Sequence, residues 1–346
     1  MSKLFLYEIK KILSGAALWI FIGLCLALNI WTMPRGFRVE LDTTTPYPTN
    51  VFEGYDTGTI AERYISGLGL TGRTAQRMRA KFDALQTSVD RLALTGDSYS
   101  PYFGEHTFNM HQSLFNSFGL VGRLLLQGAI LAVLLALLCI GHEQAHHTQH
   151  VVYATKTGRR LLRLKIAASL VTGIGLYALL AAVTLALHFS VVDFSNVWGS
   201  SVSSGFNFLA DFHSGARPFA TWQSFTVRSY LWASLGVSLG LVICFSLMGA
   251  IVGTFSKNGY VGFLVVLLIN ALCLVLPMVL PINSYLPFIV LMSPMGLWSN
   301  ADLWFTDGGF FTLWRNFELW GMGISLLILA ALCVFAMKKF ETRDIA

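Results

Sequence analysis

The sequence predicts an all-α polytopic membrane protein with six transmembrane helices, an N-terminal interfacial amphipathic helix and a helical extracellular insertion after the first span. Two observations carry this prediction. Only 12% of the 346 residues are charged, about half the share found in soluble domains, and 55% are apolar. Long apolar runs also recur at the roughly 17–25 residues that a helix needs to cross hydrocarbon. We place the spans at residues 15–33, 119–141, 166–190, 226–255, 260–281 and 319–337.

The charges of the connecting segments predict the orientation. Residues 1–14, the loop 142–165, the turn 256–259 and the tail 338–346 hold 12 of the 24 basic residues but only four of the 18 acidic ones. Lys and Arg accumulate in cytoplasmic loops, so we expect a multi-pass plasma-membrane protein with both termini in the cytoplasm. Insertion thus accounts for the net charge of +6, and we expect membrane lipid rather than nucleic acid as a partner.

Residues 1–14 are predicted to form a basic amphipathic helix in the membrane surface. Its apolar face consists of Phe5, Ile9, Ile12 and Leu13. The run that follows is not interrupted by a convincing small-residue cleavage site, so we expect it to be a retained span.

Three segments are predicted to lie outside the cell: 34–118, 191–225 and 282–318. In the first, residues 71–94 favour a helix with an apolar stripe along one face. This stripe could pack against other residues of the same outer segment or pair with the stripe of a second copy, and packing within the segment is the expected arrangement. The stripe consists of Met78, Phe82, Leu85, Val89 and Leu92. In the third, the apolar patch 286–294 is too short to span and favours a re-entrant hairpin, with tryptophans at the headgroup level.

The positions of the cysteines and the lack of a phosphate-binding loop argue against a disulfide framework and against ATP binding by this chain. Each of the five cysteines falls in a different predicted span, so a disulfide framework is not expected. The chain has no GxxxxGK[ST] loop. If ATP powers this protein, another chain binds it.

Residues 142–146 match the HExxH pattern of zinc peptidases, in which His142 and His146 would bind zinc and Glu143 would activate water. A catalytic zinc needs a third protein ligand, and the neighbouring His147 and His150 are poorly placed to supply it. A zinc peptidase is therefore an alternative, and solvated histidines at the headgroup level are the simpler interpretation.

The same loop carries a second pattern along its whole length. Glu143 follows a span and Thr148 comes five residues later, with Lys165 at the entry to the next span. Between them lie the apolar residues Val151, Val152 and Tyr153, then a Thr-Gly turn, then the paired arginines Arg159 and Arg160. This loop resembles that of ABC transporter permeases of the exporter type 2 family. His147 stands where that family usually has glycine, and the proline before the turn is missing.

The resemblance implies a permease subunit rather than an enzyme. The loop would form a coupling helix that docks on a cytosolic ABC ATPase, with ATP and Mg on that partner and no cofactor on this chain. In this reading, Glu143, Thr148, Val151–Tyr153, Arg159, Arg160 and Lys165 are the ATPase-coupling residues. A second copy or a sister permease would complete the transporter. The cargo would be an amphiphile such as a peptide antibiotic, a lipid or a drug. A non-transporting sensor or assembly subunit is a further alternative.

Three polar residues inside the spans have two interpretations each. Arg123, Gln127 and Asn270 could line a cavity or a contact between permease halves. Snorkelling of Arg123 to the headgroups is slightly favoured, and an interhelical hydrogen bond is the default for Asn270.

Overall fold

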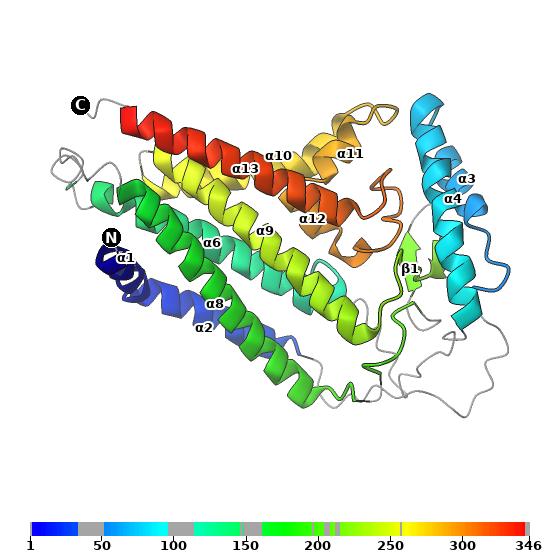
Figure 1. Ribbon diagram of the computed structural model, residues 1–346, viewed down its shortest axis with the longest axis horizontal. Coiled ribbons are helices and arrows are strands. Elements are labelled where there is room, and N and C mark those ends of the chain that lie inside the picture. Colours follow the sequence, from blue (N-terminus) through cyan, green and yellow to red (C-terminus); the bar gives the residue numbers. More distant parts are fainter. Residues whose placement is uncertain are drawn as a thin grey trace.

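The fold is seen in a computed structural model that describes residues 2–33, 52–95, 114–145, 148, 161–195, 197–203, 208–211, 215–256 and 258–342. Long helices form an elongated bundle, and a smaller helical unit covers one end of it (Figure 1). Helix α1 and the C-terminal end of α13 lie at the opposite end (Figure 1).

Five helices are long and apolar enough to cross a membrane, and they coincide with the last five predicted spans. They are α6 (Leu120–Ala145), α8 (Leu161–Val191), α9 (Val227–Phe255), α10 (Gly259–Val279) and α13 (Phe317–Thr342). A bent pair can supply a sixth span: α1 (Ser2–Leu13) and α2 (Ala16–Trp31) meet at 58°. The chain is therefore a multi-pass helical protein, and the count of six stays a prediction.

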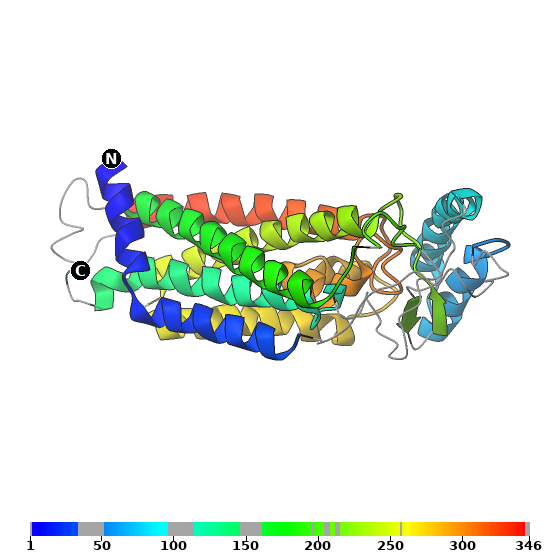
Figure 2. The same cartoon turned by 90° about the horizontal axis from the view of Figure 1, so that it is seen from below.

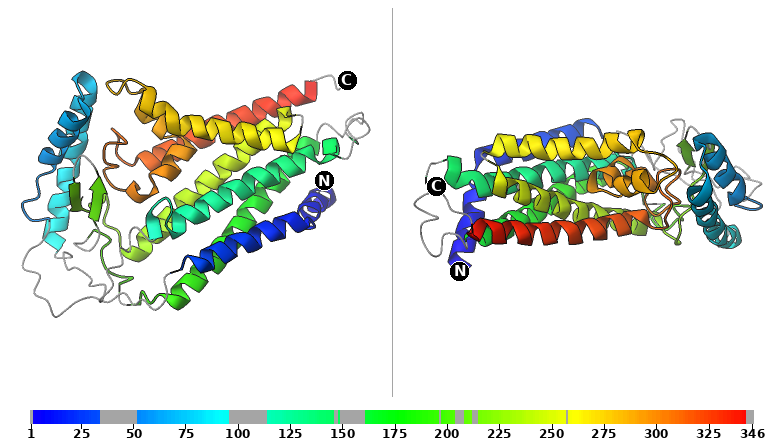
Figure 3. Two further views of the ribbon diagram at one scale, coloured as in Figure 1. Left: turned by 180° about the vertical axis from the view of Figure 1, so that it is seen from behind. Right: turned by 90° about the horizontal axis from the view of Figure 1, so that it is seen from above.

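The bend separates the amphipathic helix from the first apolar helix, as the sequence predicts. Figure 2 and Figure 3 show α1 lying across the end of the bundle, while α2 runs alongside the other long helices. Gly15 is extended rather than helical, with φ −73° and ψ 115°, so it ends the first helix and begins the second.

Helices α6 and α9 form the centre of the bundle. In the apolar windows of these helices, 72% and 67% of residues are buried inside the chain, against 17% for both α10 and α13. Close approach depends on small residues: a Cβ on Gly249 of α9 would lie 3.0 Å from the Val133 Cα and 3.2 Å from the Ala136 Cβ of α6. The apolar faces of α10 and α13 are left for lipid or for another protein.

Replacing Gly249 with alanine is expected to destabilise the protein by about 1–3 kcal/mol, because the added methyl group presses on backbone that cannot rotate away. Gly236 on the same helix is the matched control, since its Cβ would meet nothing within 4 Å. Gly236→Ala should cost nothing and favour the helix slightly. Thermal unfolding in detergent, followed by tryptophan fluorescence, measures both; equal midpoints for the two variants would contradict this packing.

The unit at the far end contains α3 (Thr57–Leu68) and α4 (Gly72–Thr95), and we call it the outer unit after the side on which the sequence predicts it. Helix α4 confirms the helix predicted at 71–94, whereas α3 was not anticipated. All five stripe residues of α4 are at most 3% exposed. The stripe packs on Trp222, Phe288 and Leu313 of the same chain, so the expected packing within the chain is the arrangement observed.

The outer connections correct the purely α-helical prediction. Residues 191–225 contain an antiparallel pair of strands, β1 (Phe208–Asp211) and β2 (Gly215–Pro218). Strands of four residues are too short to show a period of two in a Ser- and Gly-rich sequence. Residues 282–318 hold two short helices, α11 (Leu286–Leu291) and α12 (Pro294–Ser299), which supports a hairpin.

The tryptophans of this hairpin do not all lie at a lipid surface as predicted. Trp304 is completely buried and Trp298 is 8% exposed. The Trp304 Nε1 donates to the Leu297 carbonyl at 3.0 Å, and the Trp298 Nε1 donates to the Gly122 carbonyl at 2.9 Å. The Trp304 indole therefore closes the hairpin on itself and the Trp298 indole joins it to α6. A buried indole with a hydrogen-bonded N–H is satisfied as well as one at a headgroup.

A buried ionic cluster fastens the outer unit to the segment between α12 and α13. The Arg217 guanidinium binds both carboxylate oxygens of Asp307 at 2.8 Å. The Lys81 Nζ donates to the carbonyls of Asp307, Gly309 and Thr312 at 2.9, 2.6 and 2.9 Å. Burial lowers the pKa of Lys81 to about 7, although the Asp307 carboxylate opposes the shift. We call Lys81, Arg217 and Asp307 the outer clamp.

Candidate functional site at the loop between the second and third spans

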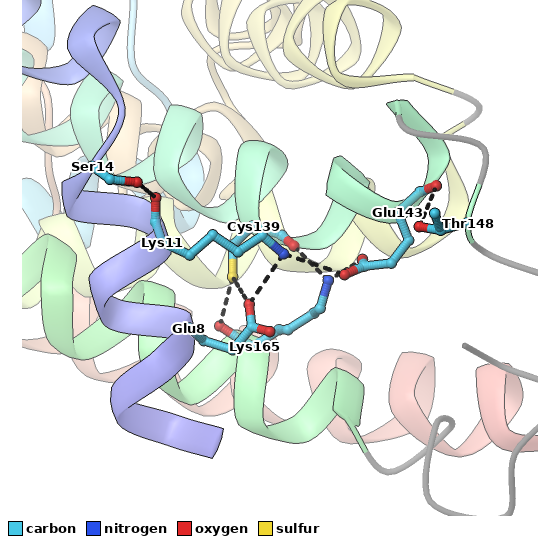
Figure 4. A network of polar contacts seen from close by, with 7 residues as sticks. All are labelled: Glu8, Lys11, Ser14, Cys139, Glu143, Thr148 and Lys165. Carbon is cyan, nitrogen blue, oxygen red and sulfur yellow. Dashed lines mark hydrogen bonds and ion pairs between the residues drawn. The ribbon is translucent and has the colours of Figure 1, made fainter. Parts of the chain in front are cut away.

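The end of α6 and the start of α8 meet at the end of the bundle that α1 crosses (Figure 4). Here the Lys165 Nζ donates to a Glu143 carboxylate oxygen and, at 2.9 Å, to the Cys139 carbonyl. Lys165 is completely buried and Glu143 is 5% exposed. A buried pair of this kind stabilises only when both charges are satisfied, which the extra carbonyl bond helps to achieve. The two ends of the loop are therefore joined directly.

Helix α1 contributes two more charges to the same place. The Lys11 Nζ lies 3.4 Å from the other Glu143 oxygen and 3.6 Å from a Glu8 oxygen. Glu8 is 4% exposed, and its carboxylate also lies 3.9 Å from the Cys139 thiol. We call Glu8, Lys11, Glu143 and Lys165 the basal charge cluster; its two acids and two lysines balance. The cluster connects α1, α6 and α8.

Thr148 closes the end of α6. Its backbone N–H donates to the Glu143 carbonyl at 2.9 Å, and its hydroxyl lies 3.5 Å from the same oxygen. This satisfies a carbonyl that the helix itself leaves free. Arg163, in the first turn of α8, pairs with Glu341 of α13 at 2.7 Å. The loop thus begins and ends on anchored residues.

Several predicted coupling residues cannot be placed. Val151, Val152, Tyr153, Arg159 and Arg160 lie outside the described residues, as does His146. Among the described ones, Lys165 is completely buried, so in this structure its ammonium does not reach a surface on which an ATPase would dock. Its position inside three packed helices, which the sequence pattern could not reveal, turns its ammonium toward Glu143.

The sequence analysis missed Glu8 and Lys11 as members of this site. One signal was present: Glu8 lies three residues after Phe5 and four before Ile12, so it interrupts the apolar face of the amphipathic helix. An acid on such a face calls for a buried cation. Glu8 meets Lys11 on its own helix, but the contact of Lys11 with Glu143, which lies 132 positions away, depends on the fold.

The zinc alternative competes for the same carboxylate. Glu143 would have to activate water, but Lys165 and Lys11 hold both of its oxygens. Within the part of the chain that the structure describes, no three His, Cys, Asp or Glu residues are grouped to hold a metal ion.

The polar residues inside the spans contact neighbouring helices. Gln127 and Asn29 of α2 exchange two side-chain hydrogen bonds of 2.9 Å, and Asn29 donates to Thr184 of α8 at 3.2 Å. The Asn270 amide lies 3.3 Å from the Met248 sulfur of α9, in keeping with the interhelical contact expected for it. Arg123 donates to the Thr32 hydroxyl at the outer end of α2.

No protein-family model matches the chain, and no curated protein or solved structure matches it significantly. Residues and geometry are therefore the basis for a function.

Proposed function

We propose that the chain is the permease subunit of an ATP-driven ABC exporter in the plasma membrane, with both termini cytoplasmic. A separate cytosolic ATPase would bind ATP and Mg, and a second permease would complete the transporter. The cargo would be an amphiphile, such as a peptide antibiotic, a lipid or a drug. One observation carries the proposal: the two ends of the loop between α6 and α8 are held by a buried, balanced charge cluster.

Transmission of force through this loop requires that both of its ends be held firmly. A loop that receives a push from a partner must not yield at its ends, and here Glu143 and Lys165 join those ends. Lys11 extends the connection to α1, which leads through Gly15 into α2. A displacement of the loop would therefore move α1, α6 and α8 together. Burial makes these contacts less sensitive to salt than exposed pairs are.

The first test is capture of the ATPase. The tagged permease, purified from native membranes, is expected to bring an ABC ATPase with it and to hydrolyse ATP. Changing Val151, Val152 and Tyr153 to aspartate should remove the ATPase from the complex, because a coupling helix docks through apolar side chains. Lys338→Glu, an exposed charge change at the same end of the bundle, is the control and should leave the complex intact.

The outcomes separate the proposal from its alternatives. Loss of the ATPase from the triple variant alone, with unchanged elution from size exclusion, supports the coupling role. An ATPase that stays bound would refute that role. Stoichiometric zinc with peptide cleavage abolished by Glu143→Gln would establish the peptidase instead. A complex that moves no solute in an ATP-dependent way would favour the sensor or assembly subunit.

A further inference from the structure

A polar seam runs between α2, α6 and α8, near the end of the bundle that faces the outer unit. Its inner layer is Asn29, Gln127 and Thr184, all buried and mutually hydrogen-bonded at 2.9–3.2 Å. The side-chain amides of this layer are hydrogen-bonded within the layer, so these residues are accounted for by the contact between the three helices.

The outer layer lies one turn further along each helix, and its two basic side chains have buried nitrogens without partners. It consists of Thr32, Arg123 and His188, which we call the seam cluster. Arg123 donates one nitrogen to the Thr32 hydroxyl, while its buried Nε has no partner. Within the described residues no carboxylate pairs with this guanidinium. His188 is 2% exposed, and neither of its ring nitrogens has a hydrogen-bond partner.

Arg123 lies one turn before Gln127 on α6, and His188 lies one turn after Thr184 on α8, so both basic groups extend the hydrogen-bonded layer toward the same end of the bundle. Buried basic nitrogens without partners are costly unless something binds them. Buried polar atoms without partners are rare, and ionisable residues inside a membrane usually mark a site. The guanidinium and an imidazole N–H together form a donor set for an anion, and a guanidinium matches phosphate oxygens in pairs.

The surroundings indicate what the anion is attached to. The contact between Arg123 and Thr32 lies at the exposed surface of the chain rather than in its interior. Next to it, Trp31 is 83% exposed and Val191 is 41% exposed, although both are apolar. A ligand that places phosphate on Arg123 would therefore lay hydrocarbon along the ends of α2 and α8. Aromatic side chains at this level are typical of the boundary between headgroups and acyl chains.

We propose that the seam cluster binds the phosphate headgroup of an anionic phospholipid from the leaflet at this end of the bundle. The Arg123 guanidinium and His188 hold the phosphate oxygens, and Thr32 orients the guanidinium. In the orientation proposed above this is the outer leaflet. The inference does not depend on coupling to an ATPase, because it uses a different end of the molecule and other residues.

The test is native mass spectrometry of the intact protein released from nanodiscs of mixed phosphatidylcholine and phosphatidylglycerol. The wild type should retain phosphatidylglycerol, and Arg123→Gln should retain at least about tenfold less, as expected for the loss of a charge-assisted pair. Arg228→Gln is the matched control: Arg228 is exposed near the same end of α9 and has no side-chain partner among the described residues. It should retain lipid like the wild type.

Two further measurements identify the donor set and the source of the phosphate. His188→Phe, which keeps a buried ring but removes both nitrogens, should reduce retention several-fold, and unchanged retention would overturn the role of His188. Inorganic phosphate in millimolar excess should not displace the lipid; displacement would identify a site for free phosphate instead. Equal losses in Arg123→Gln and Arg228→Gln would mean only general attraction to anionic membrane and would refute the site.

Discussion

Replacing Lys165 with methionine is expected to lower the free energy of unfolding by about 3 kcal/mol, because breaking a buried ion pair leaves an uncompensated charge. In the variant Glu143 and Glu8 would share Lys11 as their one cation within the described network, and the Cys139 carbonyl would lose its Lys165 donor. Methionine preserves the length and the apolar stem of the side chain, so packing changes little. Unfolding in mixed detergent micelles, followed by tryptophan fluorescence, measures the loss.

The double variant Glu143→Gln with Lys165→Met separates the ion pair from simple damage. It removes one acid and one base, so Glu8 and Lys11 remain as a balanced pair. It should therefore be less destabilised than the sum of the two single variants, with a coupling energy in the range of about 0.5–3 kcal/mol. Strict additivity would contradict the pairing of Glu143 with Lys165.

The same variants test the proposed mechanism. If the basal charge cluster keeps the loop stiff, Lys165→Met should bind the ATPase but transport less cargo for each ATP hydrolysed. A variant that retains full coupling despite its lower stability would show that the cluster only stabilises the fold.

Asp307→Asn is expected to destabilise the outer unit by about 3–5 kcal/mol, because it leaves Arg217 as a buried cation without a counter-charge. The three members of the outer clamp are 0–5% exposed. Amide hydrogen exchange should rise along α4 while α6 and α9 stay protected, since the clamp fastens only the outer unit. Unchanged exchange in α4 would argue against the clamp.

Glu62→Gln provides the matched control for the outer clamp. Glu62 pairs with Arg79 on the same unit at 2.6 Å, but both side chains are at least half exposed. Water already screens this pair, so its loss should have little or no effect on exchange or unfolding. A large effect of Glu62→Gln would mean that burial is not what distinguishes the two pairs.

The spans and the outer helix could be predicted because their signals are local. Apolar runs marked the five long helices to within a few residues, and a period of three to four marked the stripe from Met78 to Leu92. The hairpin of β1 and β2 and the helix α3 escaped prediction. The first is too short to repeat a pattern, and the second is stabilised by the α4 face on which it packs.

The sequence by itself determined which segments form long apolar helices and predicted which side faces the cytoplasm, because hydropathy sums over neighbouring residues and charge bias is read loop by loop. It also singled out Glu143, Lys165 and Arg123 as unusual. Only the tertiary structure decided their partners: Lys165 turns inward to Glu143, Lys11 arrives from α1, and Lys81 reaches a loop 226 residues away. A buried charge needs a counter-charge within a few ångströms, and the fold alone determines which distant residue supplies it.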